Sequence, residues 1–265
     1  LNAKDWVLNA VKELESFEEV ILLNRTFASS YYDHNMVVLD QRVADHKSCP
    51  DTYEPRRRLW QVRASKVILA TGAAERPLVF ANNDLPGVVL ASAAQSYTNL
   101  YGVFLGKKAA VFTNNCSAYS VAVCLKRAGV EVPAIIDVRS EIPRSSSVMA
   151  KDAAIPVICG SVVCRANGRK LLKSVTIDKI DADCVLLGHE QQITCDWLCV
   201  SGGWAPNVHL HSHAKGTLRY DEVLAAFVPD KAGQQNQSIG AANGTFDLTG
   251  CLKEGFKSGQ LAAEA

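Results

Sequence analysis

The chain has 265 residues, a length that allows one large domain or two of ordinary size, each with its own core. Its formal net charge of +1 gives no electrostatic case for a nucleic-acid partner or an anionic membrane surface. We expect neither a signal peptide nor a membrane span, because no apolar run is long enough to cross a bilayer. The nine cysteines are odd in number and scattered, as in proteins of a reducing compartment, so a cytoplasmic location is expected.

The first quarter of the chain predicts a helix followed by a meander of strands. An amphipathic helix begins almost at once within residues 1–17, and the apolar run 20–23 predicts a short buried strand. Residues 26–32, 36–43 and 59–63 then alternate apolar and polar side chains, which is typical of half-exposed strands. A small sheet is therefore expected ahead of the first motif that suggests a ligand.

That motif is the sequence VILATG at Val67–Gly72, a strand-like run that ends in small residues. A strand ending in such a turn is typical of a sheet edge that faces a ligand crevice. The motif is weak alone, but a meander precedes it and a βαβ pattern follows about forty residues later. We therefore interpret it as a candidate cofactor contact.

The βαβ pattern lies between Ala109 and Arg139. Residues 109–112 predict a strand buried on both faces, and apolar residues recur at helical spacing from 118 to 125. Gly129 stands where a helix ends, and residues 132–136 predict the second strand. Asp137 ends that strand about twenty residues past the turn, where dinucleotide-binding folds place a carboxylate on the ribose hydroxyls.

The turn of this βαβ unit departs from the dinucleotide fingerprint, which has glycines at its first, third and sixth positions. Thr113, Asn115 and Ala118 occupy those positions here. Alanine is accepted at the last position, and asparagine can adopt the left-handed conformation at modest cost. The side chains of Thr113 and Asn115 fill space that a pyrophosphate needs. The turn thus predicts a fold and only weakly a nucleotide, although helix N-terminal amides still attract phosphate.

The remaining segments complete a second domain and return to the first. Residues 201–207 form another strand-to-glycine turn, and residues 238–242 predict a short strand. His209, His211 and His213 alternate after that turn, but no fourth ligand is evident, so we favour no metal site. Helices are further predicted at 90–101, 145–153 and 248–265, and strands at 156–164, 171–177, 184–187 and 197–200.

Several segments, which span nearly the whole chain, together carry a resemblance to a known family. They are YYDHN (31–35), RLWQVRA (58–64), VILATGAAERPLVFANNDLPGVVLASA (67–93), VFTNNCSAYS (111–120), CDWLCVSGGWAPNVHL (195–210) and LAAFVPD (224–230). With them the chain resembles the α subunits of heterotetrameric sarcosine oxidases, within the pyridine nucleotide-disulfide oxidoreductase-like flavoproteins. The FTNN turn and the SGGW-P-VHL stretch are specific to that family.

The resemblance implies a multi-subunit oxidoreductase that demethylates sarcosine oxidatively. The products would be glycine, hydrogen peroxide, and formaldehyde or methylene-tetrahydrofolate. NAD would be bound in the α subunit, FAD and FMN in the β subunit, and γ and δ subunits would complete the complex. Tetrahydrofolate would belong to an α-subunit domain that this chain lacks.

The resemblance also implies an α/β fold with two Rossmann-like dinucleotide-binding domains of the FAD/NAD(P)-binding type. The first, discontinuous domain would comprise residues 1–103 and 206–265 and would lack its N-terminal βαβ unit. The second would comprise residues 104–205 and carry the degenerate phosphate loop. The chain would then match a central segment of the α subunit.

Eight cofactor-binding positions follow from matching the family's motifs. Thr26 and Phe27 lie where adenine packs in related folds. Ala241 replaces the aspartate that holds a flavin ribityl chain, so an adenine nucleotide is favoured over a flavin. The strand-end contact corresponds to Ala70, Thr71, Gly72 and Ala73, and a third contact to Gly240 and Ala241.

No paired carboxylates, nucleophile elbow or activated cysteine is recognisable in the sequence. We therefore expect a nucleotide-binding scaffold without catalytic residues, inactive in isolation. Two alternatives stay open: a subunit of a related opine or amine dehydrogenase, and a stand-alone NAD(P)H-dependent flavoprotein reductase.

Overall fold

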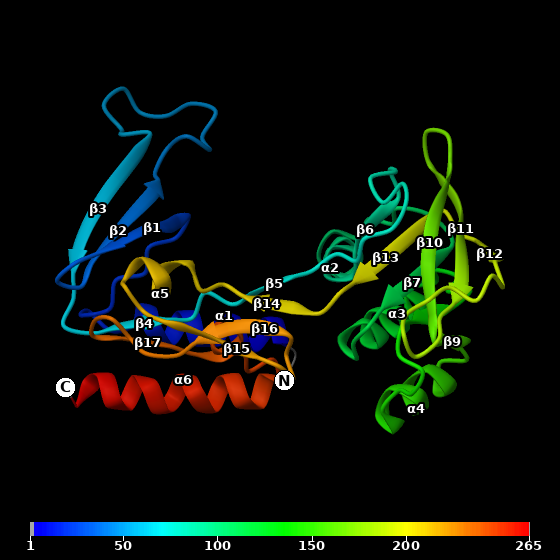
Figure 1. The fold of residues 1–265 in the computed structure, drawn as a ribbon. Helices are drawn as coiled ribbons and strands as arrows, with labels where there is room; N and C mark the ends of the chain where they lie inside the picture. The colour runs from blue at the N-terminus through cyan, green and yellow to red at the C-terminus, as the bar shows by residue number, and fades with distance from the viewer. Residues whose placement is uncertain (1–2, 265) are drawn as a thin grey trace. The chain divides into compact units, whose positions relative to one another are not determined.

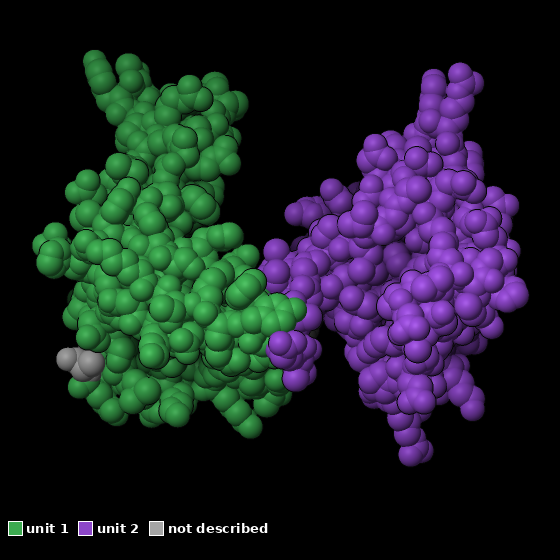
Figure 2. Space-filling view, in the orientation of Figure 1, with its two compact units in different colours: residues 1–72, 206–221, 227–265 green, residues 73–205, 222–226 purple. Residues whose placement is uncertain are grey.

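The computed structural model describes residues 3–264, which form two compact units (Figures 1 and 2). Unit 1 comprises residues 1–72, 206–221 and 227–265, and unit 2 comprises residues 73–205 and 222–226. The predicted division at 103/104 differs from this one, because the stretch 73–103 lies in unit 2. The reason is strand pairing: β6 (Val88–Leu90) pairs in parallel with β13 (Trp197–Ser201).

Unit 2 is built on a five-stranded sheet in the order β6-β13-β7-β8-β9. β7 (Ala109–Thr113) lies between β13 and β8 (Ile135–Asp137), and β9 (Val157–Cys159) forms the edge. Every pair in this sheet is parallel. β7 and β13 are buried along their whole length, as the continuous apolar runs predict for strands covered on both faces.

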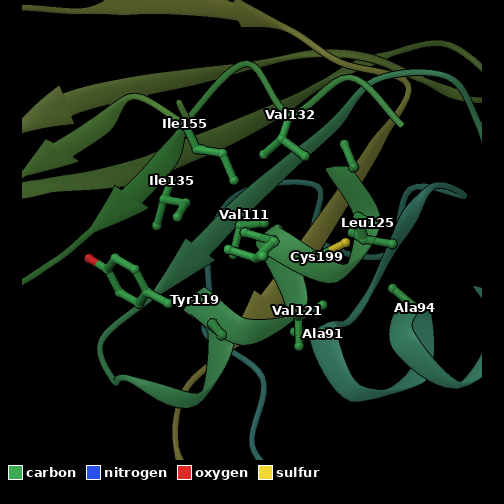
Figure 3. Packing of buried hydrophobic residues seen from close by; sticks show 14 of the residues in the cluster. Ala91, Ala94, Val111, Tyr119, Val121, Leu125, Val132, Ile135, Ile155 and Cys199 are labelled. Carbon is green, nitrogen blue, oxygen red and sulfur yellow. The ribbon is translucent and has the colours of Figure 1, made fainter. Parts of the chain in front are cut away.

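Side chains of the central strands alternate between two cores. Val111 and Cys199 pack in one cluster with α2 (Ala91–Tyr101) and α3 (Ser117–Arg127), as Figure 3 shows. Phe112 and Leu198 belong to the other cluster, which a second, antiparallel sheet covers. That sheet consists of β10 (Ser161–Gly168), β11 (Leu172–Lys179) and β12 (Gln191–Thr194), while α4 (Arg144–Asp152) contributes to the helical side.

Two predicted strands of unit 2 differ in the structure. The run 156–164 is broken at Gly160, whose φ of +59° separates β9 from β10. Glycine adopts this left-handed conformation without penalty, so the chain can leave the parallel sheet for the antiparallel one. The run 184–187 forms no strand and contributes only the isolated bridge between Ile180 and Leu186.

Unit 1 contains smaller sheets. β1 (Thr26–Tyr32), β2 (Met36–Arg42) and β3 (Arg57–Arg63) form the antiparallel meander that their alternation predicts. β4 (Val67–Leu69) and β17 (Asn236–Ser238) form a two-stranded parallel sheet. The other elements are α1 (Ala3–Glu15), α5 (His209–His213), β15 (Leu218–Asp221) paired with β16 (Ala226–Pro229), the 3₁₀ turn η1 (Gly240–Asn243) and α6 (Leu248–Ala263). β5 (Ala73–Glu75) and β14 (Trp204–Pro206) pair where the chain passes between the units.

The apolar core of unit 1 is small. In its described part the buried cluster consists of Tyr31, Val37, Leu69 and Ala214. The prediction of a strand at 20–23 is wrong, since the segment has no strand partner among the described residues and Ile21 is 76% exposed. None of the described helices is long and apolar enough to cross a membrane.

Candidate functional site

The paired strands β4 and β17 bring two predicted cofactor contacts to one edge of unit 1. Because the strands are parallel, with Leu69 opposite Ser238, their carboxyl ends lie next to each other. The backbone N–H of Ile239 donates to the carbonyl of Leu69 at 3.0 Å, which extends the pairing by one step. Ala70–Gly72 and Gly240–Ala241 follow directly, at the kind of edge where open α/β sheets bind ligands.

An open groove of about 540 Å³ lies beside the end of β4. Its volume falls in the range of small-molecule sites, which is roughly 300–1,000 Å³. Three of the predicted contacts, Thr26, Phe27 and Thr71, line it together. The residues that complete the lining are Ala28, Ser29, Asn207, His209 and Leu210.

Asn207 fixes the turn that follows β4. Its carbonyl accepts from the Thr71 hydroxyl at 2.8 Å, and its side-chain Nδ2 donates to the Thr71 carbonyl at 2.9 Å. Its backbone N–H also donates to the carbonyl of Gly72 at 2.9 Å. Gly72 has a φ of +73° and no heavy atom near its absent Cβ, so the left-handed backbone explains the glycine.

The chemistry of the groove suits a nucleoside better than a phosphate chain. Phe27 is 69% exposed and presents an aromatic ring, a surface on which a base can stack. Hydroxyl and amide groups come from Thr26, Ser29 and Asn207, which can serve a ribose or the edge of a base. His209 is the sole titratable side chain among the lining residues, so the groove offers no Lys or Arg to a phosphate.

The third predicted contact lies at the strand edge but does not line the groove. Gly240 has a φ of +61°, and its N–H donates to Glu254 Oε2 at 2.7 Å. Glu254 Oε1 also accepts from the Thr245 hydroxyl. A cofactor that required the Gly240 N–H would have to displace this carboxylate, and Ala241 offers no acceptor to a flavin. Ala73 begins β5 and belongs to unit 2, outside the groove.

The three histidines of α5 have separate roles. His209 lines the groove, whereas His211 is buried with its Nε2 3.0 Å from the Thr217 carbonyl. His213 Nδ1 accepts the backbone N–H of Tyr31 at 2.9 Å. Within residues 3–264, no group of three or more His, Cys, Asp or Glu side chains is arranged to hold a metal ion.

Unit 2 contains an exposed cysteine with a hydrogen bond from an arginine, which sequence reasoning missed. Cys116 is exposed just before α3, and Arg139 Nη1 donates to its Sγ at 3.3 Å. Partial burial by itself raises the pKa of the Cys116 thiol, but hydrogen bonds from Arg139 and Ser146 outweigh it. The pKa therefore lies below its usual value, which favours the thiolate. The signal in the sequence that could have indicated this contact is Arg139, a basic residue that follows β8 closely.

Comparison with curated proteins finds similarity over the whole chain. It is 41% identical over 267 residues to the sarcosine oxidase subunit alpha of Corynebacterium sp. (strain P-1), covering 100% of this chain and 27% of that protein. It is 38% identical over 268 residues to the subunit of the same name from Corynebacterium sp. (strain U-96), covering 100% and 28%. The predicted resemblance is thereby confirmed, and the chain spans about a quarter of the length of these relatives. No protein-family model matches the chain.

Solved structures confirm the predicted fold class. The thioredoxin reductase of T. acidophilum superposes with a TM-score of 0.62 at 17% identity, over 78% of this chain and 69% of that one. The L-proline dehydrogenase of P.horikoshii has a TM-score of 0.59 at 22% identity, over 88% of this chain and 40% of that one. At such identities the likeness concerns the fold, a Rossmann-like flavoprotein fold with a parallel sheet.

Proposed function

We propose that this chain forms part of the α subunit of a sarcosine oxidase, where it is a scaffold that holds the adenosine half of NAD. The similarity of the entire chain to sarcosine oxidase α subunits supports the assignment. The oxidative demethylation of sarcosine to glycine would be an activity of the whole complex, with β, γ and δ subunits. FAD and FMN would lie in the β subunit, and tetrahydrofolate would be used in another domain of the α subunit.

The observation that carries the proposal is the groove beside β4. The resemblance places Thr26 and Phe27 where adenine packs and Thr71 at the strand-end cofactor contact, and the three line one groove of suitable size. In the proposed complex, Phe27 would stack on adenine, and the turn held by Asn207 would lie against the ribose. Bound NAD carries a nicotinamide ring capable of hydride transfer, whereas the residues of this chain would only bind and orient the dinucleotide.

The cofactor content of the complete complex tests this proposal. Replacing Phe27 with alanine should weaken NAD binding about tenfold, because stacking of a base on an aromatic ring is worth roughly 1–3 kcal/mol. Leu59→Ala is a matched control, since Leu59 is 64% exposed on β3 and lies outside the groove. Full NAD retention in the Phe27→Ala complex would overturn the groove assignment.

The same preparation separates the two alternatives. A stand-alone reductase predicts flavin bound to this chain and bleaching of its absorbance by NADH. An opine or amine dehydrogenase predicts that a panel of amines finds a better substrate than sarcosine in the full complex. The proposed function predicts NAD without flavin in the α subunit and sarcosine as the preferred substrate.

A further inference from the structure

The turn between β7 and α3 in unit 2 stands where a dinucleotide-binding fold holds its pyrophosphate on backbone amides. Here three of the amides at this turn have acceptors within the protein. The N–H of Asn115 donates to Thr113 Oγ1 at 3.0 Å, and the N–H of Ser117 donates to Asn115 Oδ1 at 3.0 Å. The N–H of Asn114 points to the Ser201 carbonyl at 3.4 Å. The N–H groups of Asn114, Asn115 and Ser117 are therefore bonded within the protein itself.

The Asn115 side chain is held at both ends of its carboxamide. Oδ1 also accepts from the Ser117 hydroxyl at 2.6 Å, and Nδ2 donates to Ser201 Oγ at 3.0 Å and to its carbonyl at 3.1 Å. Trp204 Nε1 further donates to Ser117 Oγ at 3.1 Å. The carboxamide thus lies across the start of α3 as part of a hydrogen-bonded network.

The backbone of the turn also lacks the conformation that fingerprint glycines provide. No residue from Thr113 to Ala118 has a positive φ, so Asn115 does not adopt the left-handed conformation that its residue type permits. Side chains of the turn itself, Thr113 and Asn115, accept the backbone N–H groups instead.

The carboxylate predicted to bind ribose is occupied as well. Asp137 is fully buried, and its Oδ1 accepts from the backbone N–H and the Nε of Arg139, both at 3.0 Å. Its Oδ2 accepts from the Tyr119 hydroxyl at 2.7 Å and from Arg139 Nη2 at 2.8 Å. A carboxylate has about four acceptor positions, and these bonds use them. Asp137 therefore has no acceptor left for a ribose hydroxyl.

We propose that Asn115 closes the dinucleotide site of unit 2 by filling its phosphate position, and that Asp137 is withdrawn to join the unit's own structure. Unit 2 then binds no dinucleotide, and the NAD of the proposed function is held by unit 1 alone. The inference rests on that proposed function for unit 1, but it depends on different residues and can fail separately.

Photoaffinity labelling of the complete complex with an azido-adenine analogue of NAD tests the location. We expect labelled peptides from unit 1 and none from residues 113–139 of unit 2. Labelling within 113–139 would overturn the closure of unit 2, whatever happens in unit 1. Loss of labelling in unit 1, with unit 2 unlabelled, would count against the proposed function while leaving the closure intact.

A gain of binding tests the role of Asn115 directly. Asn115→Gly should free the Ser117 amide and raise the affinity of the turn for inorganic pyrophosphate about tenfold, roughly the worth of one charge-assisted hydrogen bond. The readout is the pyrophosphate-dependent shift of the Ser117 amide resonance, which reports this turn alone. Asn114→Gly is the control, because the Asn114 side chain only accepts from Asn115 Nδ2 at 3.3 Å and should give no gain.

An Asn115→Gly variant that keeps its folded amide spectrum but shows no gain over Asn114→Gly would overturn the assignment to Asn115. An equal, strong pyrophosphate response in the unaltered protein would overturn it too, since the turn would then be open. Should the variant fail to fold, the labelling of the unaltered complex still decides whether unit 2 is closed.

Discussion

The two units differ most in how completely each covers its own parallel sheet. In unit 2 the five-stranded sheet has a buried cluster on each face, one against helices and one against a second sheet. In unit 1 the parallel sheet has two strands, and its described buried cluster is limited to Tyr31, Val37, Leu69 and Ala214. Parallel sheets in proteins are normally covered on both faces, and the described sheet of unit 1 is covered less completely than that of unit 2.

Exposed apolar side chains in unit 1 support the same interpretation. Trp6 and Val7 of α1 are 50% and 51% exposed, and Phe256 of α6 is 72% exposed. Both helices therefore carry large apolar side chains that are exposed in the described structure. The comparison shows that the candidate groove lies in the unit with the smaller core, while the larger core belongs to the other unit.

The largest expected effect contrasts two Asp–Arg pairs. Asp137→Asn should destabilise unit 2 by about 3–5 kcal/mol, because it removes the buried negative charge that pairs with the Arg139 guanidinium. The pair Asp40–Arg57 on the meander of unit 1 is partly exposed, so Asp40→Asn should cost about 0–1 kcal/mol. Urea unfolding of the two variants measures both, and equal effects would contradict the contrast.

Core truncation should give the next largest difference. Ile135→Ala removes a fully buried side chain from the helical cluster of unit 2 and should cost about 2–5 kcal/mol. Leu69→Ala in unit 1 should cost less, since fewer buried neighbours surround the cavity. Hydrogen exchange resolved by residue assigns each loss to its unit. A larger cost for Leu69→Ala would show that unit 1 is the better packed of the two.

If the chain is part of an α subunit, as proposed, the full subunit should affect unit 1 alone. In the α subunit of the proposed function we expect the amides of β4 and β17 to exchange more slowly than in this chain alone, by roughly a factor of ten or more, because local opening then costs more. The amides of β7 and β13 in unit 2 should change little, since both faces of their sheet are already covered. An equal slowing in both units would contradict the difference in coverage between the two sheets.

The smallest expected effect is chemical and belongs to unit 2. The lowered pKa of Cys116 keeps more thiolate at neutral pH, so iodoacetamide should modify it several-fold faster than Cys49, which is also exposed. As the pH falls, labelling of Cys116 should persist to lower pH than that of an ordinary thiol. Arg139→Gln should slow the reaction by removing the donor to Sγ. Mass spectrometry of the labelled peptides measures these rates, and a slower Cys116 would contradict the shift.

The sequence predicted the central strands of unit 2 well. β7 and β13 are buried on both faces, and that environment leaves an apolar run that can be recognised without a structure. The run 20–23 is also apolar, but it forms no strand, since no neighbouring strand pairs with it among the described residues. An apolar run does not show whether such a neighbour exists. An apolar run in the sequence thus predicts that a strand is buried on both faces, but it does not predict which strand pairs with it.

The candidate site was predictable only in part. VILATG predicted a strand end, and β4 does end at Leu69 with Thr71 lining the groove beside it. Asn207 and His209 were not predicted as groove residues, because only folding brings them to the groove. Asn207, for example, lies 136 residues after Thr71 in the chain. Whether Asp137 serves a ribose depends on Tyr119 and Arg139, and spacing alone does not show that these donors occupy its oxygens.

The pairing of β4 with β17 constrains the order in which the chain can acquire its structure. Residues 67–69 leave the ribosome long before residues 236–238, and all of 73–205 lies between them. Unit 2 folding first would bring residues 73 and 205 together and shorten the loop that β4 and β17 must close, which lowers its entropic cost. We therefore expect residues 73–205 to fold first and the pairing of β4 with β17 to follow. Pulse-labelled refolding should show amides of β7 protected before those of β17, and the reverse order would refute this.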